Sequence, residues 1–198
     1  MVLRDYTPLP FTLLRAGSGY AQPAQVVPER VTLDDPALAV MTDLRALGAV
    51  IILSGDSVEE AHRRMIQRAV RLLLVVDQNR EVVGVITATD ILGEKPMQAV
   101  TQRGIRREEL VVRDIMTPQD QLEAIDLEDV RASRVGHIVA TLKQSGRQHA
   151  VVVERDAARG HVVRGLFSAT QIARQLGVAI PTSEIARTFS EIEAQLAH

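Results

Sequence analysis

The sequence predicts an α/β fold of the α+β type, in which two β-α-β-β-α repeats occupy most of the 198 residues. Three observations support this prediction. The octet GVITATDI at 84–91 returns almost unchanged as GLFSATQI at 165–172. A short β-branched run that ends in an acidic residue precedes each octet, which is typical of a buried strand. A segment with helical apolar spacing precedes each of these runs.

The first strand of each repeat is expected at a short apolar segment, AVIIL at 49–53 and AIDL at 124–127. A leading segment comes before each of these strands, and the two leading segments carry similar tripeptides, VMT at 40–42 and IMT at 115–117. The same order of features in both halves indicates that a whole unit was duplicated and not the octet alone.

A helix is expected next in each repeat. In SVEEAHRRMIQRA, Ser57 and Glu60 predict a capping box at the start of the helix. In SRVGHIVATLKQSG, Ser133 is the expected N-cap and Gly146 the expected C-cap. Each helix has one apolar face, made of Val58, Ala61, Met65 and Ile66 in the first and of Val135, Ile138, Val139 and Leu142 in the second.

A hairpin and a last helix complete each repeat. The hairpin begins with RLLLVVD at 71–77 or QHAVVVE at 148–154, and its second strand ends in the octet, whose tail opens the helix. Each repeat then has about 60–70 residues, which is too few to bury all its apolar faces alone. The two repeats are therefore expected to pack against each other.

This pattern divides the chain into five segments. The first repeat is assigned to residues 35–94, a linker helix to 95–109 and the second repeat to 110–178. We expect an extended, proline-containing arm at 1–34 and an amphipathic helix at 179–198. That helix would pack on its own repeats or against a partner, through the stripe Ile185, Phe189, Ile192 and Leu196.

The composition excludes several classes of function. The chain has no cysteine, so disulfides and thiolate metal sites are excluded, and a reducing compartment fits. Its net charge of −2 provides no global positive field to attract nucleic acid or anionic membranes. Because it has no apolar run long enough to span a membrane and no signal-peptide profile, we expect a cytoplasmic protein.

Neither a metal site nor an active site is predicted. The sequence has no Walker loop, nucleophile elbow or zinc-protease motif. His137, His149 and His161 recur at a constant interval, but the interval is too long for ligands within one helix or strand. We therefore expect no metal, no required cofactor and no enzymatic activity.

The order of the elements, the two leading tripeptides and the octets together resemble a tandem pair of CBS domains over roughly residues 35–177. The octets fit the pattern G-h-h-[ST]-x-x-[DN], in which h is apolar, except that Gln171 departs from it. The resemblance implies that the repeats pack sheet to sheet about a pseudo-twofold axis and leave two related clefts. Many CBS pairs bind adenosine-containing ligands there, and two pairs often associate into a flat homodimer.

The resemblance also implies that the hydroxyl and the acid of the octet contact phosphate and ribose. By position these residues are Thr87 and Asp90 in the first repeat and, with a weaker role, Ser168 in the second. Gln171 is neutral and longer than aspartate, so a ribose clamp there would be weak or absent. The same residue types form helix capping boxes, Thr87 with Asp90 and Ser168 with Gln171, so capping alone is the alternative interpretation.

The sequence thus predicts a non-enzymatic regulatory module that binds AMP, ADP, ATP or an S-adenosyl compound, with S-adenosylmethionine as the example. We expect it to form a homodimer and to signal to an effector protein in trans, away from the membrane. The alternative is a ligand-free structural adaptor or dimerisation module. A third interpretation is nucleic-acid binding through Arg103, Arg106 and Arg107, but Glu108 and Glu109 follow directly, which favours a solvated linker with local ion pairs.

Overall fold

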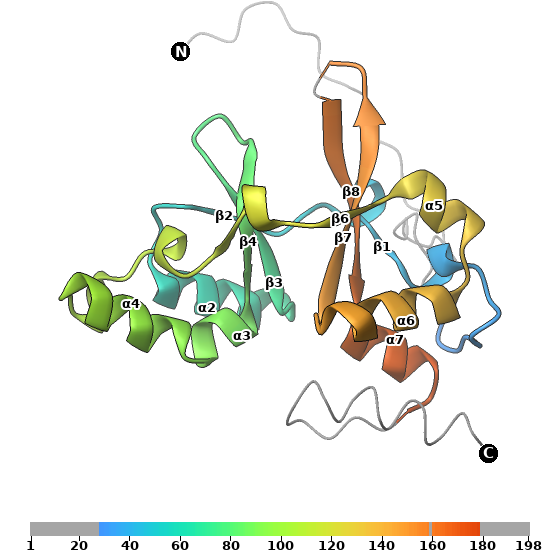
Figure 1. The fold of residues 1–198 in the computed structure, drawn as a ribbon, viewed down its shortest axis with the longest axis horizontal. Helices are drawn as coiled ribbons and strands as arrows, with labels where there is room; N and C mark the ends of the chain where they lie inside the picture. Colours follow the sequence, from blue (N-terminus) through green and yellow to red (C-terminus); the bar gives the residue numbers. More distant parts are fainter. Residues whose placement is uncertain (1–27, 159, 179–198) are drawn as a thin grey trace, which may run out of the picture.

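The computed structural model describes residues 28–158 and 160–178, which form two four-stranded sheets that pack against each other and carry helices on their outer sides (Figure 1). The predicted α/β class with two similar repeats is confirmed. The N-terminal arm as far as residue 27 and the predicted C-terminal helix with its apolar stripe lie outside the described residues.

The first sheet has the strand order β2-β3-β4-β5. Strands β2 and β3 are parallel and joined by a helix, and β3 and β4 form an antiparallel hairpin, as the repeat predicts. The strands are β2 (Ile51–Leu53), β3 (Leu72–Val76), β4 (Val82–Thr87) and β5 (Thr117–Pro118). The helices are α2 (Val58–Arg68), α3 (Ala88–Leu92) and α4 (Lys95–Arg103), with 3₁₀ turns at Arg107–Glu109 and Val112–Asp114.

The second sheet has the corresponding order β1-β8-β7-β6. Its strands are β1 (Thr42–Asp43), β6 (Ala124–Asp126), β7 (His149–Asp156) and β8 (Gly160–Ser168). Its helices are α5 (Leu127–Ala132), α6 (Val135–Ser145) and α7 (Ala169–Gln175), with 3₁₀ turns at Ala37–Val40 and Gln119–Gln121. The short helix α1 (Leu44–Leu47) connects β1 to the first sheet. Helix α5 has no counterpart in the first repeat.

The two leading segments are exchanged between the sheets, which the sequence does not predict. Strand β1 comes from the first repeat but pairs with β8, where Thr42 lies opposite Leu166. Strand β5 comes from the second repeat but pairs with β4, where Thr117 lies opposite Val85. The unit that repeats along the chain is therefore not the unit that packs in space.

The hydrophobic cores follow the same exchange. The core under the second sheet, which is built around Phe167, includes Val40 and Met41 from the leading segment of the first repeat. The core under the first sheet includes Val112 and Ile115 from the leading segment of the second. A third cluster, consisting of Leu72, Leu74, Val85 and Val151, lies between the two sheets. Strand β3 is buried on both faces, which explains its continuous apolar run.

The glycine that opens each octet lies where the exchanged leading segment crosses the strand. A Cβ added to Gly84 would lie 2.4 Å from the Thr117 carbonyl oxygen. A Cβ added to Gly165 would lie 2.6 Å from the Met41 sulfur and 3.0 Å from the Thr42 carbonyl oxygen. All three distances are shorter than van der Waals contact, so the close approach of the leading segment is the physical reason for glycine at both positions.

The structure corrects three details of the predicted helices. Val58, Ala61 and Met65 are buried, but Ile66 is 68% exposed and lies outside the apolar face. Arg134, and not Ser133, is the N-cap of α6, although Gly146 ends the helix in the left-handed conformation as expected. The Ser57 hydroxyl accepts a hydrogen bond from the Glu60 backbone N–H at 3.1 Å, as the capping box requires. The Glu60 carboxylate, however, binds arginines of its own helix and does not complete the box.

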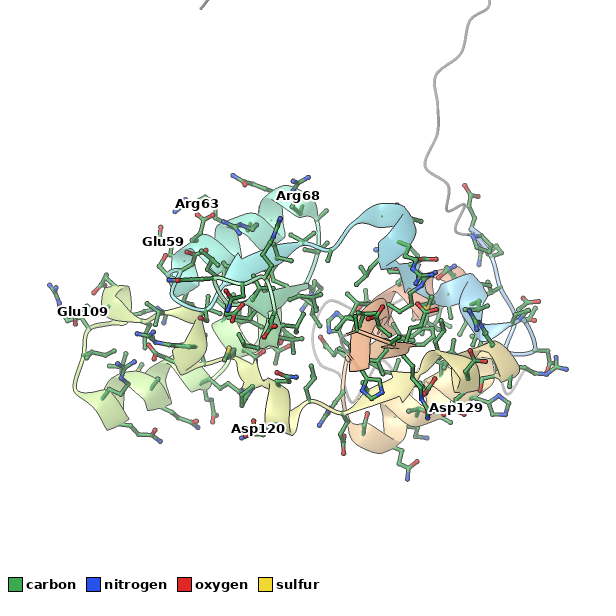
Figure 2. All side chains as sticks on the ribbon, turned by 90° about the horizontal axis from the view of Figure 1, so that it is seen from above. Glu59, Arg63, Arg68, Glu109, Asp120 and Asp129 are labelled. Carbon is green, nitrogen blue, oxygen red and sulfur yellow. The ribbon has the colours of Figure 1, made fainter. Side chains whose placement is uncertain are left out.

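The predicted linker helix is present as α4, with Pro96 in its first turn and Gly104 after its end. It is not an isolated linker, because Pro96 and Ala99 are buried against the first unit. The arginines at and after its end form ion pairs, Arg103 with Asp114 and Arg106 with Glu109. Figure 2 shows Glu109 at the outer edge of the first unit, and its pair with Arg106 is solvated, whereas the Asp114 side chain is only 8% exposed.

Candidate ligand site

The first octet ends at the junction between β4 and α3, where Thr87 is the N-cap of the helix. The Thr87 hydroxyl accepts a hydrogen bond from the Asp90 backbone N–H at 3.3 Å and donates to Asp90 Oδ2 at 2.7 Å. Asp90 Oδ2 also accepts from the Thr87 backbone N–H at 2.8 Å. The predicted reciprocal capping box is therefore confirmed in the first repeat.

The second carboxylate oxygen of Asp90 faces a lysine. Asp90 Oδ1 lies 2.6 Å from Lys95 Nζ, and the same ammonium group donates to the Ile115 carbonyl oxygen at 3.2 Å. Asp90 is only 8% exposed, whereas the Lys95 side chain is 45% exposed. The site thus holds a buried carboxylate whose ionic partner reaches into it from solvent.

The second octet has the same backbone path but a different hydrogen-bond pattern. The Ser168 hydroxyl accepts from the Gln171 backbone N–H at 3.5 Å. The Gln171 side chain does not return to Ser168: its oxygen accepts from the Thr42 hydroxyl at 3.3 Å, and its amide nitrogen donates to Gln175 at 3.4 Å. The interpretation of Ser168 and Gln171 as a reciprocal capping box is therefore wrong.

Gln171 belongs to a polar chain that holds the N-terminal segment on α7. Gln175 is 4% exposed, and its amide donates to the Pro28 and Ala39 carbonyl oxygens at 2.8 and 3.3 Å. The backbone carbonyl oxygen of Gln175 accepts from the Val31 backbone N–H at 3.0 Å. A glutamine at 171 both accepts and donates in this chain, which an ionised aspartate cannot do. This pattern gives a physical reason for the change from Asp90 to Gln171.

His149 of the second repeat lies near the ends of both octets. It lies opposite Ser168 in the β7–β8 ladder. Burial lowers the pKa of His149 to about 4, the positive charge of Arg71 lowers it as well, and the negative charge of Asp90 opposes both. A histidine of the second repeat thus lies within electrostatic reach of the acid of the first octet. The sequence predicts only that His149 is not a metal ligand. It does not predict that His149 lies beside the octets.

The low pKa of His149 should make the protein sensitive to acid. The unfolded chain takes up a proton near pH 6.5, whereas the folded protein does so only near pH 4. The free energy of unfolding should therefore fall by about 2 kcal/mol between pH 7 and pH 5. Urea unfolding at a series of pH values measures this loss. It should disappear in His149→Gln and persist in His161→Gln, which replaces an exposed histidine of β8; equal profiles for the two variants would contradict the assignment.

Residues 31–96 match the family model described as the CBS domain. This segment is therefore similar to a CBS domain. The matched segment contains the first octet and the leading segment that completes the second sheet. No curated protein matches the chain.

Solved structures with the same fold extend the similarity to both repeats. An uncharacterised protein from Pyrococcus horikoshii has a TM-score of 0.55 and 22% identity, and the match covers 77% of this chain and 100% of that one. CBSX2 from Arabidopsis thaliana, crystallised with AMP, has a TM-score of 0.50, 20% identity, and coverage of 71% and 94%. The CBS domain pair of protein MJ0100, crystallised with 5′-methylthioadenosine and S-adenosyl-L-methionine, has a TM-score of 0.50, 20% identity, and coverage of 74% and 98%. The two repeats therefore have the fold of a CBS pair.

An ionic cluster joins the leading strand β1 to the rest of the second sheet. Arg164 binds both carboxylate oxygens of Asp43 and lies 3.4 Å from Glu154, which in turn pairs with Arg45 at 2.7 Å. The Arg164 side chain is only 13% exposed. Hydrogen bonds from Arg164 hold the pKa of Asp43 below its usual value, so Asp43 stays ionised through the neutral range.

Replacing Asp43 by alanine should destabilise the protein by about 2 kcal/mol. The variant leaves the nearly buried Arg164 without its main acceptor and removes the cap that receives the Arg45 backbone N–H at 2.8 Å. Glu128→Ala is the matched control, because it breaks an ion pair with Arg131 whose side chains are 74% and 51% exposed, and it should cost less than about 0.5 kcal/mol. Thermal unfolding of both variants tests the difference. Similar losses in the two would show that the cluster is an ordinary surface pair.

Neither a metal centre nor a membrane-spanning helix is present in the described part of the chain. Within residues 28–158 and 160–178, no group of three histidine, aspartate or glutamate side chains is placed to hold a metal ion. No helix in these ranges is long and apolar enough to cross a bilayer. His137, one of the three regularly spaced histidines, instead accepts the Arg134 backbone N–H at the start of α6.

Proposed function

We propose that this CBS pair is a non-enzymatic regulatory module that binds an adenosine-containing ligand at the end of the first octet. The observation that carries the proposal is the environment of Asp90, a carboxylate that is 8% exposed at a strand–helix junction and acts electrostatically on His149 of the other repeat. Such a carboxylate can accept both hydroxyls of a ribose. CBSX2 with AMP and the MJ0100 pair with S-adenosyl-L-methionine, which share the fold, support this class of ligand.

Asp90 Oδ1 is the atom we assign to the ribose. Oδ2 is occupied by the backbone and hydroxyl of Thr87 and keeps α3 capped. Oδ1 is held by Lys95, whose partly exposed side chain can move aside when a diol binds. In this arrangement Thr87 positions the carboxylate and offers its hydroxyl to the same ligand.

The second octet is assigned a structural role. Its hydroxyl, Ser168, remains a weaker candidate contact, but Gln171 carries no charge and is engaged with Thr42 and Gln175. A ligand there would have to break the chain that fixes the N-terminal segment. We therefore propose one ligand for each chain.

The ligand would act by changing the relation between the repeats. A molecule that contacts Asp90 and the neighbourhood of His149 touches both units, so it favours the arrangement in which both contacts are best. The size of the response is set by the difference in affinity between the two arrangements, since equal affinity shifts nothing. We propose that the protein forms a homodimer in the cytoplasm, that the ligand changes its arrangement, and that an effector protein responds to this change.

A ligand-free adaptor is the second candidate, and one observation favours it. The contacts of the Asp90 carboxylate with Thr87 and with Lys95 are also those that a purely structural cap would make. In that case the octets only start helices, and the function is association with other chains. The two candidates differ in whether a small molecule stabilises the protein.

Thermal unfolding against AMP, ADP, ATP, S-adenosylmethionine and GTP tests the proposal. An adenosyl ligand at a hundred times its dissociation constant should stabilise the protein by about 2.7 kcal/mol, a rise in melting temperature of roughly 5–10 °C. Asp90→Asn should abolish the shift. Asp114→Asn should retain it, because Asp114 is a comparable buried carboxylate that caps Val111 and pairs with Arg103 outside the octets.

If no ligand raises the melting temperature, and Asp90→Asn lowers it in the same way as Asp114→Asn, the adaptor function replaces the sensor.

A further inference from the structure

The first unit exposes three large apolar side chains on neighbouring helices. Ile66 of α2, Leu92 of α3 and Met97 of α4 are between 65% and 68% exposed, more than any other large apolar side chain in the described part of the chain. Helix α3 packs against both α2 and α4, so the three residues belong to one group of helices on the outer side of the first sheet (Figure 1). We call these three residues the apolar patch.

The second repeat has no such patch. In an alignment of the two repeats on their helices and octets, the patch residues correspond in order to Lys143, Ala173 and Val178. Lys143 is charged, and both Ala173 and Val178 are buried in the core of the second unit. The repeat itself therefore does not require exposed apolar side chains at these positions. Their presence on the first unit indicates a surface that another element covers.

The chain leaves the second unit on the side where the patch lies. Val178 is buried directly after α7, so the starting point of the segment that follows it is set by the second core. Helices α3 and α7 begin near each other, because Asp90 of α3 acts electrostatically on His149, which lies opposite Ser168, the N-cap of α7. Figure 1 shows α3 and α7 on the same side of the two sheets.

The segment 179–198 has the pattern and the length to cover the patch. Its stripe Ile185, Phe189, Ile192 and Leu196 recurs at helical spacing, so a helix there has one apolar face. Such a helix over 183–197 is about 22 Å long, and residues 179–182 before it span up to about 14 Å. Their sum exceeds the diameter of a small domain, about 30 Å, which is enough to reach from α7 to the helices of the first unit.

A second copy of the chain fits the patch less well than this segment does. A stable interface between two proteins buries about 800 Å² on each partner, and three side chains supply only part of that area. A single amphipathic helix docks through a few apolar side chains on one face, which is the size of the patch.

We propose that residues 179–198 form a helix that docks on the apolar patch of the same chain through Ile185, Phe189, Ile192 and Leu196. The docked helix removes its own apolar stripe and the patch from water together. It is anchored in the second unit and makes its contact in the first, so it acts as a clasp between the two units.

Alkylation of an introduced cysteine tests this clasp on the full chain, which has no natural cysteine to react. Met97→Cys places a thiol in the patch, and Gln78→Cys places one in the exposed turn between β3 and β4 as the reference for an open position. Iodoacetamide should react with Met97→Cys at least about tenfold more slowly than with Gln78→Cys. Adding Phe189→Glu to Met97→Cys should remove this protection. Ala194→Glu, which places the same charge on the opposite face of the helix, is the matched control and should retain it.

Three results would overturn the inference. Equal rates for Met97→Cys and Gln78→Cys would mean that the patch is open. Protection that survives Phe189→Glu, or that is lost equally with Ala194→Glu, would mean that the stripe does not make the contact. If an excess of the wild-type protein restored protection to the Phe189→Glu variant, the occupant would be a second copy and not the same chain.

Discussion

Truncating Phe167 to alanine is expected to lower the free energy of unfolding by about 3–5 kcal/mol. Phe167 is completely buried on the helix-facing side of β8 and is among the largest fully buried side chains of the described residues. Removing its ring leaves a cavity among side chains that belong to strands, helices and the exchanged leading segment. Phe167→Leu keeps most of the apolar volume and should lose less than half as much.

The Phe167→Ala variant also tests how strongly the two units depend on each other. Val40 and Met41 lie in the same core as Phe167, and the chain continues from them through β1 and α1 into the first sheet. We therefore expect a single transition in urea, with reduced hydrogen-exchange protection of β3 in the first sheet as well as of β7. A loss below about 1 kcal/mol, or unchanged protection of β3, would contradict this coupling.

Gly84→Ala is expected to destabilise the protein by about 3 kcal/mol. The new Cβ would lie 2.4 Å from the Thr117 carbonyl oxygen and 3.2 Å from both the Met116 sulfur and the Pro118 Cα. Two of these atoms belong to backbone, so β5 would have to move away from β4, which is the costly form of overpacking. Chemical denaturation measures the loss, and hydrogen exchange at the residues of β5 should locate it.

Gly55→Ala is the matched control for the Gly84 variant. A Cβ at Gly55 meets no atom within 4 Å, and its backbone does not lie in the left-handed region. The substitution should therefore be neutral or slightly stabilising, because alanine reduces the freedom of the unfolded chain. A Gly84→Ala protein as stable as Gly55→Ala would show that the leading segment does not cross the octet closely.

Sequence reasoning predicted the elements of the fold because the relevant signals are local. The alternation of apolar residues, the β-branched runs and the capping residues all act within a few positions, and β2, β3, β4, α2 and α4 lie where these signals place them. The duplication then determined that both halves share one order of elements. Ile66 shows the limit of this approach, since its spacing fits the apolar face but no neighbouring element covers it.

The exchange of the leading segments could not be predicted in the same way. A short apolar segment such as VMT has the same pattern whether it completes its own sheet or its neighbour's, and only tertiary packing decides between them. The candidate site shows the same division. The sequence identified Thr87 and Asp90 by the capping pattern, but it could not place Thr42 beside Gln171, because the exchange of the leading segments creates that contact.

The exchange also limits how the chain can be divided. A fragment cut at the repeat boundary would lose its outer strand and part of its core, and it would carry a leading segment suited to a sheet that is absent. Two copies of such a half could restore both by lending each other these segments, in the manner of a domain-swapped dimer. The present chain has the architecture of that dimer with its two subunits fused, so a single ancestral half would have been an obligate pair before it was ever duplicated.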